Sequence, residues 1–306
     1  MTVTCVHPSV RALGAILLLV GFAPLSRAVA PRSAMADHLT WMGPVVAETN
    51  YSTWCVAPIL GDDGKTHLFC ARWPEANVDP AWRKSSEIAH YVADQPEGHY
   101  TFREVVLKGS GRTGEWDAFA PHNPEVRRFG DTYALVYIAN SDFHQPPHPR
   151  NQQIGMVTAS SLDGPWKKVN DGGPLLSPSA DSNHWTHGSQ VVNPTLLKVG
   201  DTFHLYFKAR YKGGTAYGLA TAKRLEGPYT MEPTPLTYDG IFIEDGSAFM
   251  WNGRVCLLTT DNHGKVTGTR GAGALWTSDD GRRFDPKSVQ LGYDLIPHYF
   301  KGYDAA

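Results

Sequence analysis

The sequence predicts an all-β protein, a five-bladed β-propeller, and three observations support this expectation. Phrases of similar sequence recur along the chain at spacings of several tens of residues. Each phrase holds alternating apolar runs separated by a turn, which is the pattern of a β-hairpin. The composition is rich in glycine, proline and aromatic residues, and only 19% of the residues are charged. Many short strands joined by turns would produce this profile.

The clearest repeat has two parts. Residues 122–140 read "HNPEVRRFGDTYALVYIAN", and residues 192–210 read "VNPTLLKVGDTFHLYFKAR". Aligned at Asn123 and Asn193, both phrases place a Gly-Asp turn at the same offset. The second part is "GMVTASSLDGPW" at 155–166, which matches "GLATAKRLEGPY" at 218–229. Each unit is therefore expected to form a hairpin followed by one or two further strands.

Two weaker copies extend the series. They are "APILGDDGKTHLF" at 57–69 and "EDGSAFMWNGRVCLL" at 244–258, the latter followed by "GALWTSDDGRRF" at 273–284. Repeated units of roughly 50 to 70 residues with four strands each are typical of propeller blades. A blade cannot bury both of its faces alone, so the blades pack in a ring. Four visible copies and one composite blade, made of the last residues and the first mature ones, would give five. A β-sandwich built from similar hairpins is the alternative.

The N-terminal region has the features of an export signal. Residues 12–25 form the apolar run "ALGAILLLVGFAPL", which is too short to span a bilayer comfortably. The small-residue triplets that end at Ala30 and Ala36 both fit the cleavage rule. We expect a signal peptide within residues 1–36, cleaved after Ala30 or Ala36, and a secreted or periplasmic protein. The alternative to a signal peptide is a buried N-terminal helix. Residues 37–306 are expected to form one domain.

The charge and the apolar runs of the chain limit the kinds of partner that are expected. The net charge is −2 and basic residues do not cluster, so no nucleic-acid partner is expected. No second long apolar run follows the first, so no membrane partner is expected after signal cleavage.

Cys55 and Cys70 flank the turn "GDDG", which leaves open a cross-strand disulfide or two packed thiols. Cys256 is expected in the core.

The repeats resemble the five-bladed propeller glycoside hydrolases. This group includes the arabinanases and β-xylosidases of glycoside hydrolase family 43 and relatives such as invertases and α-neoagarobiose hydrolases. The resemblance rests on "NPEVRRFGDTYALVY", "NPTLLKVGDTFHLYF" and the two Gly-Pro-aromatic turns. It implies a central pocket with acidic side chains from different blades. It also implies hydrolysis, with inversion, of a terminal or near-terminal sugar of a plant or algal oligosaccharide or polysaccharide fragment.

The chain departs from the family pattern at the position that precedes the proline, where the family often has a catalytic carboxylate. Aligned on proline, the first three copies have Ala57, Asn123 and Asn193 there. The fourth copy has Asp245, followed by Gly246 instead of proline. Three readings remain open: a glycoside hydrolase with relocated acids, a non-catalytic carbohydrate-binding propeller, and a propeller lyase or transglycosylase.

Asp245, Glu244 and Asp117 are the catalytic candidates, because glycoside hydrolysis needs two groups across the scissile bond. Glu244 and Asp245 interrupt an apolar strand, and acids in such a place serve a site or an ion pair. Strand neighbours point to opposite sides, and the alignment favours Asp245 as the residue that faces the pocket. Asp117 follows Trp116 just before an inner strand and could be a base or only cap a turn.

Seven further residues are candidates for substrate binding, each with a structural alternative. The histidines could also supply a proton, and Lys208 could bind an anionic group on the sugar. No zinc-like ligand spacing is present, so no metal site is predicted from the residues and no cofactor is required. A central calcium ion follows only from the family resemblance. The substrate-binding candidates are Trp116, His122, Asn123, Glu125, His187, Asn193 and Lys208.

Overall fold

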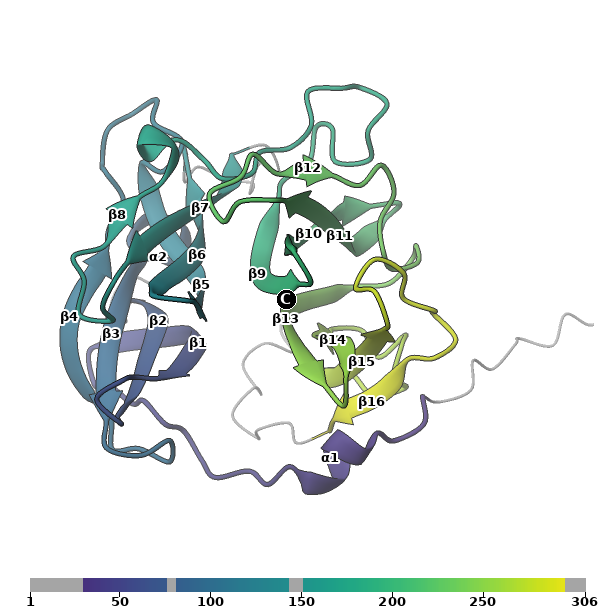
Figure 1. Cartoon of the computed structure of the whole chain (residues 1–306), viewed down its shortest axis with the longest axis horizontal. Coiled ribbons are helices and arrows are strands. Elements are labelled where there is room, and N and C mark those ends of the chain that lie inside the picture. The colour runs from purple at the N-terminus through teal and green to yellow at the C-terminus, as the bar shows by residue number, and fades with distance from the viewer. Residues whose placement is uncertain (1–29, 76–80, 143–150, 295–306) are drawn as a thin grey trace, which may run out of the picture.

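The computed structural model describes residues 30–75, 81–142 and 151–294, and these form an all-β propeller. Four antiparallel sheets of four strands each stand around a common centre (Figure 1). Each sheet uses four consecutive strands in chain order. Every sheet is therefore one blade, and the repeated phrases of the sequence are successive blades.

The blades are numbered along the chain. Blade 1 contains β1 (Tyr51–Leu60), β2 (Thr66–Pro74), β3 (Glu87–Ala93) and β4 (Thr101–Leu107). Blade 2 contains β5 (Phe119–Phe129), β6 (Thr132–Asn140), β7 (Gln152–Ala159) and β8 (Lys167–Lys168). Blade 3 contains β9 (Val192–Val199), β10 (Thr202–Tyr211), β11 (Gly214–Ala222) and β12 (Thr230–Met231). Blade 4 contains β13 (Ile243–Trp251), β14 (Arg254–Asp261), β15 (Ala272–Ser278) and β16 (Gln290–Tyr293). Three short helical elements accompany the blades: α1 (Ala34–His38), α2 (Ala81–Lys84) and the 3-10 turn η1 (Asn170–Gly172).

The repeated Gly-Asp pair makes the tight turn between the first two strands of blades 2 and 3. Phe129 pairs with Thr132, and Val199 pairs with Thr202, so each turn has two residues. Gly130 and Gly200 have φ values of 63° and 57°, a region that glycine adopts without steric cost. The predicted hairpins are thereby confirmed.

The second repeated part forms the third strands, and a tryptophan packs on each. A Cβ atom added to Gly155 would lie 2.4 Å from the Trp116 ring, and one added to Gly218 would lie 2.4 Å from the Trp185 ring. Trp116 also donates a hydrogen bond of 2.7 Å from Nε1 to the Gly172 carbonyl. The indole of Trp116 therefore fills a space inside blade 2.

The described residues contain four blades, so the predicted count of five is not confirmed. The N-terminal segment, which was expected to supply part of a composite blade, makes only a one-residue parallel bridge, from Arg32 to Leu291 beside β16. Figure 1 shows residues 30–50, in purple, running along the outside of the opening between blades 1 and 4. The last residues of the chain, 295–306, lie outside the described residues.

The predicted signal run at residues 12–25 also lies outside the described residues, as does the rest of the chain before Ala30. In the part of the chain that the structure describes, no helix is both long and apolar enough to cross a bilayer.

Candidate active site

The innermost strand of every blade carries an irregularity at the same place. The pairing register of β1, β5, β9 and β13 with the next strand shifts there. One residue at each shift has a left-handed backbone: φ is 51° at Cys55, 47° at Asn123, 48° at Asn193 and 48° at Asp245. Such φ values are uncommon outside glycine, and a β-bulge re-aims the side chain it carries. The same bulge therefore recurs once per blade and points four side chains toward one place.

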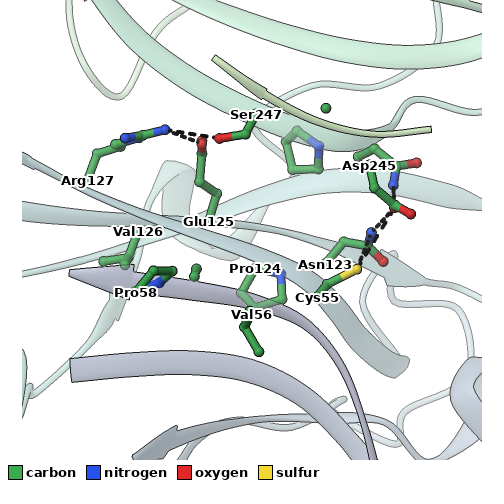
Figure 2. A pocket seen from close by; sticks show the side chains of 14 residues that line it. Cys55, Val56, Pro58, Asn123, Pro124, Glu125, Val126, Arg127, Asp245 and Ser247 are labelled. Atoms are coloured by element: carbon green, nitrogen blue, oxygen red, sulfur yellow. Dashed lines mark hydrogen bonds and ion pairs between the residues drawn. The ribbon is translucent and has the colours of Figure 1, made fainter. Parts of the chain in front are cut away.

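These four side chains meet at one carboxylate oxygen. Asp245 Oδ1 accepts hydrogen bonds of 2.5 Å from Asn193 Nδ2 and 3.0 Å from Asn123 Nδ2. The Cys55 thiol lies 3.9 Å from the same oxygen and accepts a 3.0 Å bond from Asn123 Nδ2. Figure 2 shows Cys55, Asn123 and Asp245 gathered at one side of the cavity. All four described blades thus contribute to the environment of Asp245.

The cavity has a volume of about 320 Å³ and is formed by the innermost strands alone. This volume lies at the lower end of the range for small-ligand sites. The lining residues are 55–58 of β1, 123–127 of β5, 193–194 of β9 and 245–247 of β13. A ligand in this cavity would contact all four blades at once.

Glu125 and Arg127 lie at the side of the cavity opposite Asp245 and join three blades (Figure 2). Glu125 accepts hydrogen bonds of 2.6 Å from Arg127 Nη2, from Thr195 Oγ1 and from the Leu196 backbone N–H. Arg127 Nη2 also donates a 2.8 Å bond to the Ala248 carbonyl in blade 4. Glu125 therefore links blade 2 to blade 3 by hydrogen bonds at the edge of the cavity.

The adjacent carboxyl groups of Glu244 and Asp245 have pKa values shifted in opposite directions. Desolvation by the surrounding strands raises the pKa of Asp245, although the residue stays exposed at the cavity, and the nearby Glu244 charge raises it further, against the opposing effects of Lys208 and Asn123. Burial also acts to raise the pKa of Glu244, but the charge and hydrogen bond of Lys208 outweigh it, so this pKa is lowered. Two carboxyls whose pKa values are driven apart are suited to acid and base roles.

Comparison with known proteins identifies the fold. No protein-family model matches the chain, and no curated protein matches it by sequence. Solved structures do match: a family 117 glycoside hydrolase from Zobellia galactanivorans is 18% identical, with a TM-score of 0.65 over 81% of this chain and 71% of that one. The chain has the fold of the propeller glycoside hydrolases.

Two further structures of this fold show the same relationship. A protein described as a glycoside hydrolase is 14% identical, with a TM-score of 0.67 over 84% of this chain and 79% of that one. A thermostable family 43 glycoside hydrolase is 12% identical, with a TM-score of 0.54 over 80% and 77% of the two chains. The predicted resemblance to propeller glycoside hydrolases is thereby confirmed at the level of the fold.

Cys55 is a cavity residue that sequence reasoning missed, as it missed Arg127. Trp54 pairs with Ala71 and Val56 with Cys70, so the bulge leaves Cys55 out of the ladder. Its side chain turns to the cavity, whereas Cys70 is fully buried in blade 1, and both are free thiols. The open question of a Cys55–Cys70 disulfide is therefore answered in favour of two thiols. Burial, with the charges of Asp245 and Glu244, holds the pKa of the Cys55 thiol well above its usual value.

The alignment of the first copy on its proline was wrong. That alignment set Ala57 beside Asn123 and Asn193, whereas the bulges place Cys55 there. The mistake arose because Pro58 lies two residues beyond the position that proline occupies in blades 2 and 3, where blade 1 has Val56. An alignment of the paired strands by register would have revealed Cys55.

Four of the predicted site residues, Asn123, Glu125, Asn193 and Asp245, line the cavity. Six others do not. Glu244 and the buried Lys208 form an ion pair with each other beside Asp245. Asp117 is buried and forms an ion pair with Lys168 of β8, and Trp116 packs inside blade 2 as described above.

The two predicted histidines also lie outside the cavity lining. His122 is buried, its Nδ1 donates a 2.6 Å hydrogen bond to the Ala120 carbonyl, and burial lowers its pKa to about 4. The neutral imidazole ring therefore stabilises the irregular part of β5 through this hydrogen bond. His187 is exposed, and its Nδ1 contacts the Ser179 carbonyl at 3.1 Å. As predicted, Cys256 is buried.

The cavity is a poor match for the calcium ion that the resemblance implied. Calcium takes six to eight oxygen ligands. Here the two asparagines turn their NH₂ groups toward Asp245, Cys55 supplies sulfur, and Glu125 already accepts three hydrogen bonds. Among the described residues one other group, His67 and His90 with Asp163, has its side chains close enough together to hold a metal ion, and it lies away from the cavity. The two imidazoles there contact each other, with His67 Nδ1 2.8 Å from His90 Nε2.

Proposed function

We propose that the protein is a glycoside hydrolase with Asp245 as its central catalytic group. The observation that carries this proposal is the convergence of four left-handed bulge residues, one per blade, on Asp245 at the cavity. A strained backbone conformation costs free energy and persists where the surrounding structure imposes it, which is common at functional sites. The recurrence of this conformation around one carboxyl group favours a built site over chance.

We assign Asp245 the role of proton donor to the glycosidic oxygen. A general acid must hold its proton near the working pH, and the raised pKa of Asp245 supports this role. Oδ1 receives the bonds from Asn123 and Asn193, which leaves Oδ2 as the oxygen that can carry the proton. Glu244, with its lowered pKa, stays ionised in its ion pair with Lys208 beside Asp245.

The cavity supports cleavage at or near the end of a sugar chain. Its volume of about 320 Å³ is small, and Arg127 crosses one side of it from blade 2 to blade 4. Fragments of plant or algal polysaccharides are the proposed substrates. One structural neighbour, 13% identical with a TM-score of 0.65, is described as an RGII complex. The proposal includes export of the protein through the N-terminal signal.

A specific observation favours a second candidate, a carbohydrate-binding propeller without catalysis. Three of the four bulge positions hold Cys55, Asn123 and Asn193, none of which carries a charge at neutral pH. The asparagine amides could then bind sugar hydroxyl groups, with Asp245 as an acceptor. This candidate predicts binding of oligosaccharides without turnover.

The two candidates are separated by measuring sugar release from a panel of plant and algal oligosaccharides. We expect release by the wild type and a loss of at least about 100-fold in Asp245→Asn, as is usual when a general acid is removed. Asp131→Asn, the same change in an exposed hairpin turn, is the matched control and should retain activity. Binding without release would instead favour the non-catalytic propeller, and full activity in Asp245→Asn would reject the assignment of Asp245.

A further inference from the structure

Two histidines of blade 1 stand where the other three described blades have apolar or aromatic side chains. His67 lies on β2 and His90 on β3, and both are buried. Their equivalents follow from the strand register, counted from the first hairpin turn of each blade, and are buried as well. Packing in a blade therefore needs no imidazole at either position. The equivalents of His67 are Tyr133, Phe203 and Val255, and those of His90 are Val157, Ala220 and Trp276.

The two imidazole rings face each other, and each has a carboxylate at its other nitrogen. His67 Nδ1 lies 2.8 Å from His90 Nε2. His67 Nε2 lies 3.3 Å from both carboxylate oxygens of Asp63, in the turn between β1 and β2. His90 Nδ1 lies 3.7 Å from Glu104 Oε1 on β4. The four side chains therefore form a row in which two imidazoles stand between two carboxylates.

This row has three contacts, but two neutral imidazoles supply only two protons. A neutral imidazole carries one N–H group, and an ionised carboxylate only accepts hydrogen bonds. If both rings donate to their carboxylates, two nitrogen lone pairs face each other at 2.8 Å. If one ring donates to the other, a lone pair faces a carboxylate. His90 Nδ1 is buried and has no hydrogen-bond partner among the described residues, which is costly. A cation in the row would remove this conflict.

A proton does not supply that cation at neutral pH. Burial, together with the charge of His67, lowers the pKa of His90 to about 4. Phe69 stacks on the His90 ring with the ring centroids 4.5 Å apart, which holds this imidazole in an apolar environment. Neutral imidazole nitrogens are common ligands of zinc, whereas calcium and magnesium take oxygen ligands. The row therefore favours a transition-metal ion.

Asp163 of blade 2 offers a third ligand to the same place. It lies in the turn between β7 and β8, and a carboxylate oxygen of Asp163 and one nitrogen of each histidine all lie within 4.8 Å of one another. The Asp163 side chain is 49% exposed, so an ion can enter from solvent. Arg103 lies 3.3 Å from Asp163, but its side chain is 60% exposed, so this ion pair is weak and can open.

We propose that His67, His90 and Asp163 bind one zinc ion, which joins blade 1 to blade 2. Both rings then turn their N–H groups to Asp63 and Glu104, and a carboxylate behind each ligand is the usual way in which zinc-bound histidines are oriented. Zinc–nitrogen bonds of about 2.05 Å set tetrahedral ligands roughly 3.3 Å apart, so the facing nitrogens must separate by about half an ångström. Small side-chain rotations provide this, and water completes the four ligands. Sequence spacing did not reveal the site because its ligands lie on two blades.

Calorimetric titration of the chelator-treated full chain with zinc chloride tests this proposal. The wild type should bind one ion per chain, and zinc should raise its thermal unfolding midpoint by several degrees, because a ligand of the folded state stabilises it. Asp163→Asn should weaken zinc binding by at least about 10-fold. Glu226→Gln is the matched control, because Glu226 holds the same position in the repeated turn of blade 3. It should leave zinc binding unchanged.

Histidine variants add a second comparison. His67→Ala and His90→Ala should abolish zinc binding, whereas His204→Gln, which changes a buried histidine of blade 3, should not. If the variants of His67 and His90 do not fold, the comparison of Asp163→Asn with Glu226→Gln decides the matter.

Three results would overturn the proposal. The first is a wild-type chain that binds no zinc at micromolar concentrations. The second is equal zinc affinity in Asp163→Asn and Glu226→Gln. The third is binding that disappears in Cys55→Ser, because the ion would then lie in the cavity, where Cys55 offers a sulfur ligand.

Discussion

The Nδ2 atom of Asn193 lies 2.5 Å from Oδ1 of Asp245, although the two residues belong to different blades. The left-handed bulges at the two residues make this contact possible. In a regular strand the side chains would alternate between the two faces of the sheet, and the bulge instead turns each side chain toward the other. The pair fixes both the position of the carboxyl group and the oxygen that accepts hydrogen bonds. Asn193 is therefore a positioning residue for the proposed proton donor.

Asn193→Asp should extend activity to higher pH. A second carboxyl group at this distance forms a coupled pair, and one of its pKa values is strongly raised. If Asp245 donates a proton, activity is lost as the pH rises through this value, so the alkaline limb should move up by about one unit or more. Asn193→Ala removes only a hydrogen-bond donor and should move it less. A pH–rate profile measures both, and an unchanged alkaline limb in Asn193→Asp would contradict the assigned role.

Acidification should destabilise the protein between about pH 6.5 and pH 4. Burial lowers the pKa of His90, His122 and His204 to about 4, whereas unfolded histidines titrate near 6.5. In this window the unfolded chain binds more protons, so the free energy of unfolding falls as the pH falls, by up to about 1 kcal/mol per pH unit for each group. Denaturant unfolding at several pH values gives the slope. His204→Gln should reduce it, and a flat profile would show that these rings can be protonated when folded.

Glu125→Gln should lower the stability of the protein, because it weakens hydrogen bonds between blades. The change weakens three hydrogen bonds of 2.6 Å and leaves Arg127 without its carboxylate. Because Arg127 is 32% exposed, solvent compensates part of the loss, and we expect a cost of about 1–3 kcal/mol. Asp62→Asn, which breaks the exposed Arg128–Asp62 pair, is the control and should change little. Equal denaturation midpoints for the two variants would contradict the interblade role.

The position at which the proposed signal peptide is cleaved should affect stability. A chain that begins at Pro31 keeps the ion pairs of Arg32 with Asp37 and Asp294 and the backbone bonds between residues 31–33 and Leu291. A chain that begins at Asp37 loses the bonds from residues 31–36. Thermal unfolding of the two chains compares them directly, and we expect a higher midpoint for the longer chain. Identical midpoints would show that β16 needs no support from this segment.

The repeats predicted the hairpins and the blade architecture because turn chemistry and alternation are local properties. Gly130-Asp131 and Gly200-Asp201 make the turns that their sequence requires. The number of blades was harder to predict, because the ends of the chain carry no copy of the repeat. Residues 30–50 pack along existing blades instead of adding a sheet.

The site was only partly predictable, because side-chain direction depends on register. Asp245, Asn123 and Asn193 were found through the repeat, but one bulge reverses which residues face inward, and this hid Cys55. Asp117 stands close to the inner strand in sequence, yet its side chain turns to Lys168 at the far strand of its own blade. Such choices follow from packing partners that lie more than fifty residues away.

The hydrogen bond from Arg127 of β5 to the Ala248 carbonyl of β13 spans two blades that are not consecutive. The guanidinium group of Arg127 therefore adds a direct side-chain link between the second and fourth described blades. Because Arg127 and Ser247 both line the cavity, the width of the cavity on this side depends on the conformation of one side chain in addition to the backbone of the sheets.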